Sequence, residues 1–219
     1  MSQKPKFTIE VVKPEDKKEF YEVMREFFIK DEPVTKSLGI MDINELKFYL
    51  TKNISENCCF KAIDENGKII GAVANGIERR QDLNDIKNNN EEEEEIIDER
   101  WKKLCMLFDN VDKNYNIFKI YPNINIYLAG KAIAVNPKYR GLGIAGELIN
   151  KTVEFMKQNN INLMIRTCTS AFSARVMEKS NMKEVYKINY KDFIVNGEQL
   201  LKPESPHTAC KVFILDIEN

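Results

Sequence analysis

The sequence lacks the features that mark several large classes of protein. It has a single histidine, and no histidine or cysteine pair shows metal-ligand spacing, so nothing supports a metal site. A net charge of −1 excludes the global basic field that attracts nucleic acid or an anionic membrane. No apolar run is long enough to span a bilayer. We therefore expect no metal, no nucleic-acid partner and no membrane association.

We also expect no signal peptide, because the first residues, Met-Ser-Gln-Lys-Pro, carry no apolar stretch. The five cysteines are an odd number, which without export indicates reduced thiols and favours a cytoplasmic protein. The 219 residues, 43% of them hydrophobic, suffice for a substantial core, and we expect a single domain over residues 1–219. The sequence does not decide the oligomeric state, and a monomer is our default expectation.

Hydrophobic periodicity predicts strands that alternate with helices. Strands are expected over Phe7–Val12, Cys59–Ile63, Lys68–Ile77, Tyr127–Val135, Ile161–Thr167, Tyr186–Phe193 and Cys210–Ile217. Helical stripes run over Phe20–Phe28, Trp101–Phe108, Ala145–Met156 and Ser173–Lys179, and an Asp42-x-x-Glu45 capping box predicts one more helix. The first stripe should end near Asp31-Glu32-Pro33, since proline disfavours helix in the residue before it. One mixed sheet with flanking helices, of the α/β or α+β class, is the expected fold.

One stretch has a biased composition, with Asn88–Asn90 followed by the acidic run Glu91–Glu95. Such a run can tether a basic partner, but a solvated loop and first helical turn is the favoured interpretation. We expect no domain boundary there.

The most informative segment runs from Ala134 to Gly146 and combines a strand end, a glycine-rich turn and a helix start. A helix start has unpaired backbone N–H groups and a positive dipole end, so it can bind a phosphate group. Arg140 adds a cation at the same place. The turn therefore predicts a ligand that carries phosphate.

A dinucleotide site is the weakest interpretation of this turn, although its glycines match G-x-G-x-x-G. In that motif the strand runs almost directly into the first glycine, whereas residues 136–140 intervene here. The motif also requires an acidic residue about 20 positions further on, and none occurs between Phe155 and Met177. No Gly-Lys-Ser/Thr follows, which excludes a P-loop.

The remaining pattern, V-x-P-x-x-R-G-x-G-x-A, resembles the acetyl-CoA-binding signature of the GCN5-related N-acetyltransferase (GNAT) superfamily. The resemblance covers about residues 127–182 and implies the GNAT fold, a mixed central β-sheet flanked by helices on both faces. Acetyl-CoA is then the cosubstrate. The resemblance places its pyrophosphate on the backbone amides of Arg140, Gly141, Leu142, Gly143, Ile144 and Ala145, and its pantetheine arm along Ile133, Ala134 and Val135.

A narrower resemblance points to the insect arylalkylamine (dopamine) N-acetyltransferases. It rests on Phe27–Pro33, Arg140–Gly146, Ser173–Lys179 and Pro206-His207, which together span nearly the whole chain. The resemblance implies that the acetyl acceptor is a small aromatic ethylamine such as dopamine, tyramine, octopamine or serotonin. Asp31, Glu32 and His207 would then lie at the amine.

Acetyl transfer needs a neutral amine, and an alkyl ammonium has a pKa near 10.4, roughly that of lysine, so a base must remove its proton. The resemblance makes Glu32 that base; the alternative for this residue is an exposed carboxylate at a helix end. The leaving thiolate needs a proton donor. Many GNAT enzymes supply a tyrosine at the position that Met177 holds here. In the arylalkylamine branch two serines belong to the site, and they match Thr169 and Ser173, of which Ser173 is also expected at the cosubstrate.

Several alternatives stay open at this point. Cys168 lies beside the proposed site and could form an acetyl-cysteine, although no base adjacent in sequence activates it. The acceptor could be a polyamine or a protein amine. The missing tyrosine also admits a protein that binds acetyl-CoA without catalysis.

Overall fold

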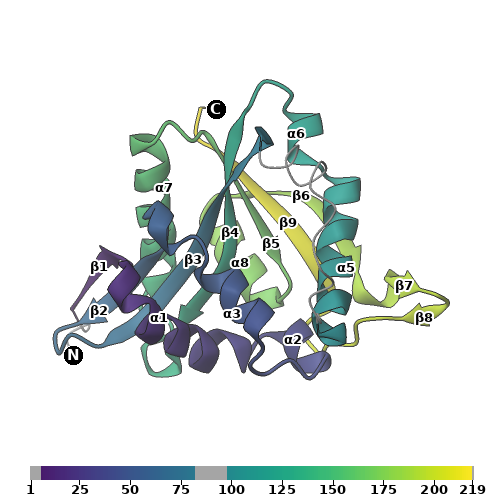
Figure 1. Ribbon diagram of the computed structural model, residues 1–219, viewed down its shortest axis with the longest axis horizontal. Helices are drawn as coiled ribbons and strands as arrows, with labels where there is room; N and C mark the ends of the chain where they lie inside the picture. The colour runs from purple at the N-terminus through teal and green to yellow at the C-terminus, as the bar shows by residue number, and fades with distance from the viewer. Residues whose placement is uncertain (1–5, 82–97, 219) are drawn as a thin grey trace.

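A seven-stranded mixed sheet lies at the centre of the protein, in a computed structural model that describes residues 6–81 and 98–218 (Figure 1). The strands are ordered β1-β2-β3-β4-β5-β9-β6, and neighbours are antiparallel except for the parallel pair β4 and β5. Their bounds are Phe7–Val11 (β1), Phe60–Asp64 (β2), Ile69–Arg79 (β3), Ile126–Val135 (β4), Leu163–Cys168 (β5), Lys183–Asn189 (β6) and Ala209–Asp216 (β9). A separate hairpin consists of β7 (Ile194–Val195) and β8 (Glu198–Gln199).

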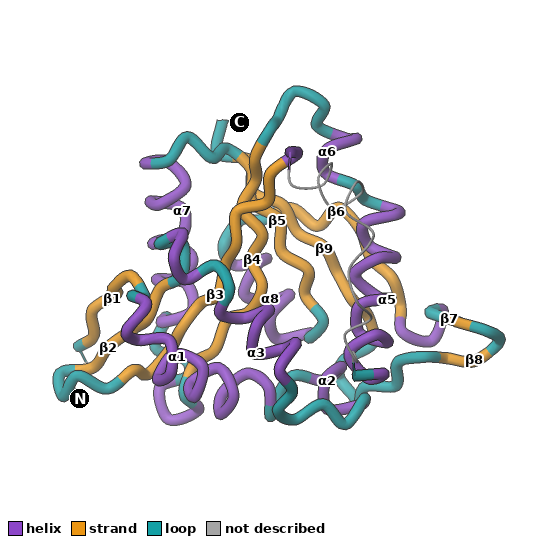
Figure 2. The backbone as a smooth tube through the Cα atoms, in the orientation of Figure 1, coloured by secondary structure: helices purple, strands orange, loops and turns teal. Residues whose placement is uncertain are grey.

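Helices cover both faces of the sheet, as predicted (Figures 1 and 2). One face carries α1 (Lys17–Met24), α3 (Asn44–Thr51), α5 (Glu99–Asn114) and α6 (Ile117–Ile120), and the other carries α7 (Ile144–Gln158) and α8 (Ala171–Lys179). The ring of Tyr49 in α3 contacts the rings of Trp101 and Phe108 in α5, which joins two helices of the first face. The short helix α2 (Pro33–Ser37) follows α1 after a π-helical turn. Within the described ranges, no helix combines the length and apolar character needed to cross a bilayer.

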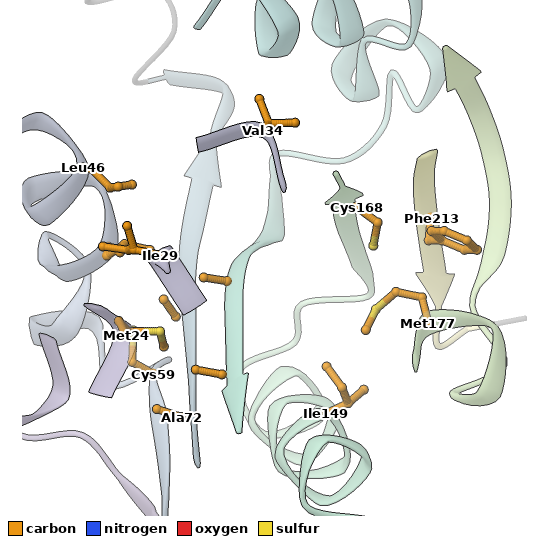
Figure 3. Close-up of a cluster of buried hydrophobic side chains, with 14 of the residues drawn as sticks. Met24, Ile29, Val34, Leu46, Cys59, Ala72, Ile149, Cys168, Met177 and Phe213 are labelled. Carbon is orange, nitrogen blue, oxygen red and sulfur yellow. The ribbon is translucent and has the colours of Figure 1, made fainter. Parts of the chain in front are cut away.

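The main hydrophobic core lies between the sheet and its helices, and Figure 3 shows part of it. Met24 of α1 and Leu46 of α3 pack on one side, and Ile149 of α7 and Met177 of α8 on the other. A second cluster lies between α7 and strands β2 and β3, where Ile144 is 1% exposed. Burial of the first residue of α7 fixes where this helix begins relative to the sheet.

Strands β4 and β5 separate partway along their length. They pair only over Leu128–Gly130 and Met164–Arg166. Beyond these residues β4 continues to Val135 paired only with β3, and β5 continues to Cys168 paired only with β9. The sheet therefore opens between two strands that continue in parallel, directly before the glycine turn.

Several predicted boundaries differ in the structure. The Asp42–Glu45 capping box is wrong: α3 begins at Asn44 without a side-chain cap, the Asp42 carboxylate accepts a hydrogen bond from Tyr21, and Glu45 Oε1 accepts one from the backbone N–H of Asp98 at 2.8 Å. The strand expected over Tyr186–Phe193 lies earlier, because a 3-10 turn begins at Tyr190. The Asn88–Asn90 and Glu91–Glu95 segment lies outside the described residues.

The first helical stripe also changes register. Residues Arg25–Ile29 form a π-helical turn, which adds a residue to the turn, so Ile29 rather than Phe28 enters the core. Phe27 and Phe28 are only partly buried. Turns of this kind occur often at functional sites, and this one ends two residues before Asp31.

Candidate active site

The glycine turn has the geometry of a phosphate-binding helix start. Gly141 and Gly143 have φ values of +82° and +85°, which other residues adopt only with strain. Gly143 is the N-cap of α7 and contributes no side-chain cap, so the first amides of this 15-residue helix stay free of such a partner. A Cβ at either glycine would meet nothing within 4 Å, so the turn borders open space. This arrangement fits a pyrophosphate.

The strand that leads into the turn offers an unpaired edge. This edge consists of Ile133, Ala134 and Val135, which pair with β3 on one side. On the side that faces β5, no strand of the described residues pairs with them. An extended ligand arm can hydrogen-bond to such an edge as an added strand does. The structure thus brings the two predicted cosubstrate segments, the β4 edge and the turn, together at the opening of the sheet.

Arg140 connects the turn to a segment far away in the sequence. Its guanidinium donates to Asp31 Oδ2 at 2.6 Å and to the carbonyl oxygen of Val135 at 3.3 Å. Both charged side chains are about half exposed, and exposed ion pairs contribute little to stability. Asp31 therefore lies beside the glycine turn.

Glu32 is buried, not an exposed residue at a helix end. It is the N-cap of α2 and only 5% exposed. Its Oε1 accepts the backbone N–H of Val34 at 3.1 Å, and its Oε2 accepts that of Thr35 at 2.5 Å. These two hydrogen bonds fix the carboxylate in place. Each of its oxygens keeps a second lone pair, so the group can still accept another hydrogen bond.

The junction between β5 and α8 presents hydroxyl groups. Ser170 is the N-cap of α8, and its Oγ accepts the Ser173 N–H at 3.0 Å. The Ser173 hydroxyl donates to the Ser170 carbonyl at 3.0 Å and lies 3.1 Å from the Ser170 hydroxyl. Burial raises the pKa of the Cys168 thiol to about 11, although Ser173 acts on this pKa in the opposite direction. Ser170 was not identified from the sequence, although a serine just before a helix is a recognisable N-cap.

The segment from Tyr190 to His207 closes over this junction. The hydroxyl of Tyr190, a residue 2% exposed, donates to the Thr169 carbonyl at 2.6 Å. His207 Nδ1 accepts the N–H of Ala171, the first residue of α8, at 3.1 Å. Burial raises the pKa of Tyr190 and lowers that of His207, and the Glu32 charge acts on both. Glu32, Tyr190 and His207 therefore share one electrostatic environment.

A cleft of about 440 Å³ adjoins this place, and Tyr190, Pro203 and His207 are among the residues that line it. Tyr190 was missed as a site residue, since nothing in its sequence context distinguishes it from a core tyrosine. Met177, at the position of the usual tyrosine, is 1% exposed and lies in the core with Cys168 and Phe213 (Figure 3). Among residues 6–81 and 98–218, no three acidic, histidine or cysteine side chains form a group that could hold a metal ion.

Comparison with known proteins gives one family and several similar structures. A model of the acetyltransferase (GNAT) family matches residues 18–179 of this chain. The structure of arylalkylamine N-acetyltransferase 2 from Aedes aegypti is similar with a TM-score of 0.85 and 25% sequence identity, covering 96% of this chain and 99% of that chain.

Two further structures share the fold at lower identity. The polyamine N-acetyltransferase of Drosophila melanogaster, an enzyme that forms N-acetylagmatine, has a TM-score of 0.83 and 20% identity, over 96% of this chain and 100% of that chain. The Arabidopsis thaliana protein NAA60, solved in complex with acetyl-CoA, has a TM-score of 0.57 and 14% identity, over 98% and 100% of the two chains.

Proposed function

Because this chain belongs to the acetyltransferase (GNAT) family, whose cosubstrate is acetyl-CoA, we propose that it acetylates the primary amine of a small arylalkylamine, such as dopamine, tyramine, octopamine or serotonin. The observation that carries this proposal is the buried Glu32 carboxylate, which is held by two backbone amides in the same environment as Tyr190 and His207. Transfer is direct, with both substrates bound together.

The opening between β4 and β5 suits the cosubstrate. The free amides of the turn and of the first residues of α7 would hold the pyrophosphate, and the β4 edge at Ile133, Ala134 and Val135 would hold the pantetheine arm. Arg140 adds a cation beside the phosphates. Bound acetyl-CoA supplies the acetyl group and a thiolate leaving group.

The residues of the chain handle two protons. Glu32 accepts one proton from the ammonium group of the amine, which frees the nitrogen lone pair for attack on the acetyl carbon. The carbon–sulfur bond then breaks, and the second proton, which the nitrogen loses as the amide forms, is available to the leaving thiolate. The leaving thiolate must gain a proton or a hydrogen-bond donor. The hydroxyls of Ser173 and Thr169 are the proposed donors, and Ser170, which contacts the Ser173 hydroxyl at 3.1 Å, joins them.

A covalent route through Cys168 is not supported. The nucleophile of such a route is the thiolate, and burial raises the pKa of this thiol to about 11, so it stays protonated at neutral pH. Ser173 acts to lower this pKa but does not offset the burial.

A polyamine acceptor is the second candidate, because the enzyme that forms N-acetylagmatine shares this fold. A polycationic substrate needs several unpaired carboxylates, however. Among the residues that the structure describes, those that line the cleft beside Tyr190 and His207 include a lysine, Lys191, and no carboxylate. The aromatic amine is therefore the proposal we favour.

A substrate panel tests the proposal. Tyramine, dopamine, serotonin, agmatine, spermidine and a lysine peptide would each be incubated with acetyl-CoA, and thiol release followed. We expect the highest kcat/KM for the aromatic ethylamines. A preference for agmatine or spermidine would establish the second candidate, and acetyl-CoA binding without turnover of any amine would refute catalysis.

A further inference from the structure

An exposed aromatic side chain stands beside the site. Phe172, in the first turn of α8, is 62% exposed. Its ring meets that of His207 edge-on, with centroids 5.1 Å apart and an interplanar angle of 86°. The histidine is held in place by the Ala171 N–H, which donates to its Nδ1. The two rings thus form an ordered pair that reaches the solvent.

Exposure alone does not make Phe172 notable, since single apolar side chains are common on protein surfaces. Its position does, because the Glu32 charge acts on the histidine that the ring contacts, and Ser173 follows one residue later in the same helical turn. Phe48 of α3, which is 64% exposed, has a lysine over its ring instead.

We propose that Phe172, together with His207, binds the aromatic ring of the amine and so determines a preference for arylalkylamines over aliphatic amines. This inference rests on the proposed function. Aromatic rings favour edge-to-face or offset contacts with each other, and Phe172 leaves most of its ring available for such a contact. The negative charge of Glu32 acts on His207, and Phe172 contacts the same imidazole ring edge-on, so Glu32 and Phe172 can serve the two ends of one small molecule.

The charges nearby agree with this assignment. Burial lowers the pKa of His207, and the donated N–H at Nδ1 requires a lone pair there, so the ring is neutral and does not repel a cationic amine. Aliphatic polyamines gain nothing from a phenyl face comparable to a ring contact.

The test compares Phe172→Ala with Phe48→Ala, a control that removes an equally exposed phenylalanine from α3. The acceptors are tyramine and phenylethylamine, which carry an aromatic ring, cyclohexylethylamine, which carries an apolar ring without π electrons, and agmatine and putrescine, which carry none. For Phe172→Ala we expect kcat/KM to fall about tenfold with the aromatic amines and less with cyclohexylethylamine. Agmatine and putrescine should change by less than about twofold, and Phe48→Ala should leave every acceptor unchanged.

Binding separates this inference from the proposed function. The protein would be saturated with coenzyme A, which cannot transfer an acetyl group, and titrated with tyramine in the calorimeter. A weaker tyramine affinity in Phe172→Ala alone supports the inference even if no amine is acetylated. Equal losses for aromatic and aliphatic amines, or no loss, would overturn it while leaving acetyl transfer intact.

Discussion

Replacing Glu32 by glutamine separates two roles of this side chain. The carboxylate accepts two backbone N–H groups, from Val34 and Thr35. The amide nitrogen of glutamine cannot accept, so one buried N–H loses its partner, which costs about 1–3 kcal/mol of stability. Loss of a general base lowers the rate by about 10²- to 10⁴-fold. Domains are typically stable by about 5–15 kcal/mol, so unfolding at 25 °C cannot imitate a rate loss of that size.

The assay is thiol release from acetyl-CoA with tyramine over pH 6–9, with urea unfolding of the same samples. Without Glu32 the reaction depends on amine that is already neutral, so kcat/KM of Glu32→Gln should rise about tenfold per pH unit below the amine pKa. The matched control is Thr35→Val, which removes the hydroxyl that bonds the carbonyls of Ile29 and Glu32 and leaves the carboxylate in place. It should lose about 1 kcal/mol of stability and little activity. A Glu32→Gln rate within threefold of wild type, with an unchanged pH profile, would refute the role of base.

Three further predictions concern the turn, the thiol and the sheet. Gly143→Ala should weaken acetyl-CoA binding and lower the stability of the protein by about 1–2 kcal/mol, because a φ of +85° strains any residue other than glycine. An unchanged dissociation constant for acetyl-CoA would contradict this prediction. Iodoacetamide should leave Cys168 of the native protein unmodified at pH 7.5, because burial raises the pKa of this thiol to about 11. Rapid labelling of Cys168, detected by mass spectrometry, would contradict this prediction. In a urea titration, Gly130→Ala should destabilise the protein by about 2–5 kcal/mol, since the new Cβ would lie 2.3 Å from Cζ of Arg166. The control is Gly146→Ala, whose new Cβ would meet nothing within 4 Å, and it should be neutral or stabilise the protein by about 0.5–1 kcal/mol.

The parts of the molecule that local sequence determines were predicted well. The glycine turn was found because positive φ, free helix amides and a cation lie within a few consecutive residues, Arg140–Ile144. Between the strands β2 and β3, the pair Asn66-Gly67 is typical of a tight hairpin turn, and Gly67 has a φ of +78° between these antiparallel strands. Both features are encoded where they occur, so one stretch of sequence suffices to predict them.

Contacts between distant residues could not be predicted in this way. The ion pair between Asp31 and Arg140 joins residues 109 positions apart, and the ring contact between Phe172 and His207 depends on how a long loop returns to α8. Asp42 has the residue type of a cap, yet the partner it finds is Tyr21, because tertiary packing competes with local capping.

One buried cation lies where the sheet opens. Arg166 is 3% exposed, and its side chain crosses β4 over Gly130 and donates to Asn75 Oδ1 of β3 at 2.7 Å. Burial lowers the pKa of Arg166 to about 10, so the charge persists at neutral pH at a cost in free energy. The last paired row of β4 and β5 is Gly130 opposite Arg166 itself. The Arg166 side chain therefore connects β5 to β3 across the row where pairing ends, and this holds the strands together up to the proposed entry point of the cosubstrate. A smaller residue at position 166 would lose the hydrogen bond to Asn75, and a larger residue at position 130 would clash with the arginine side chain where it crosses β4.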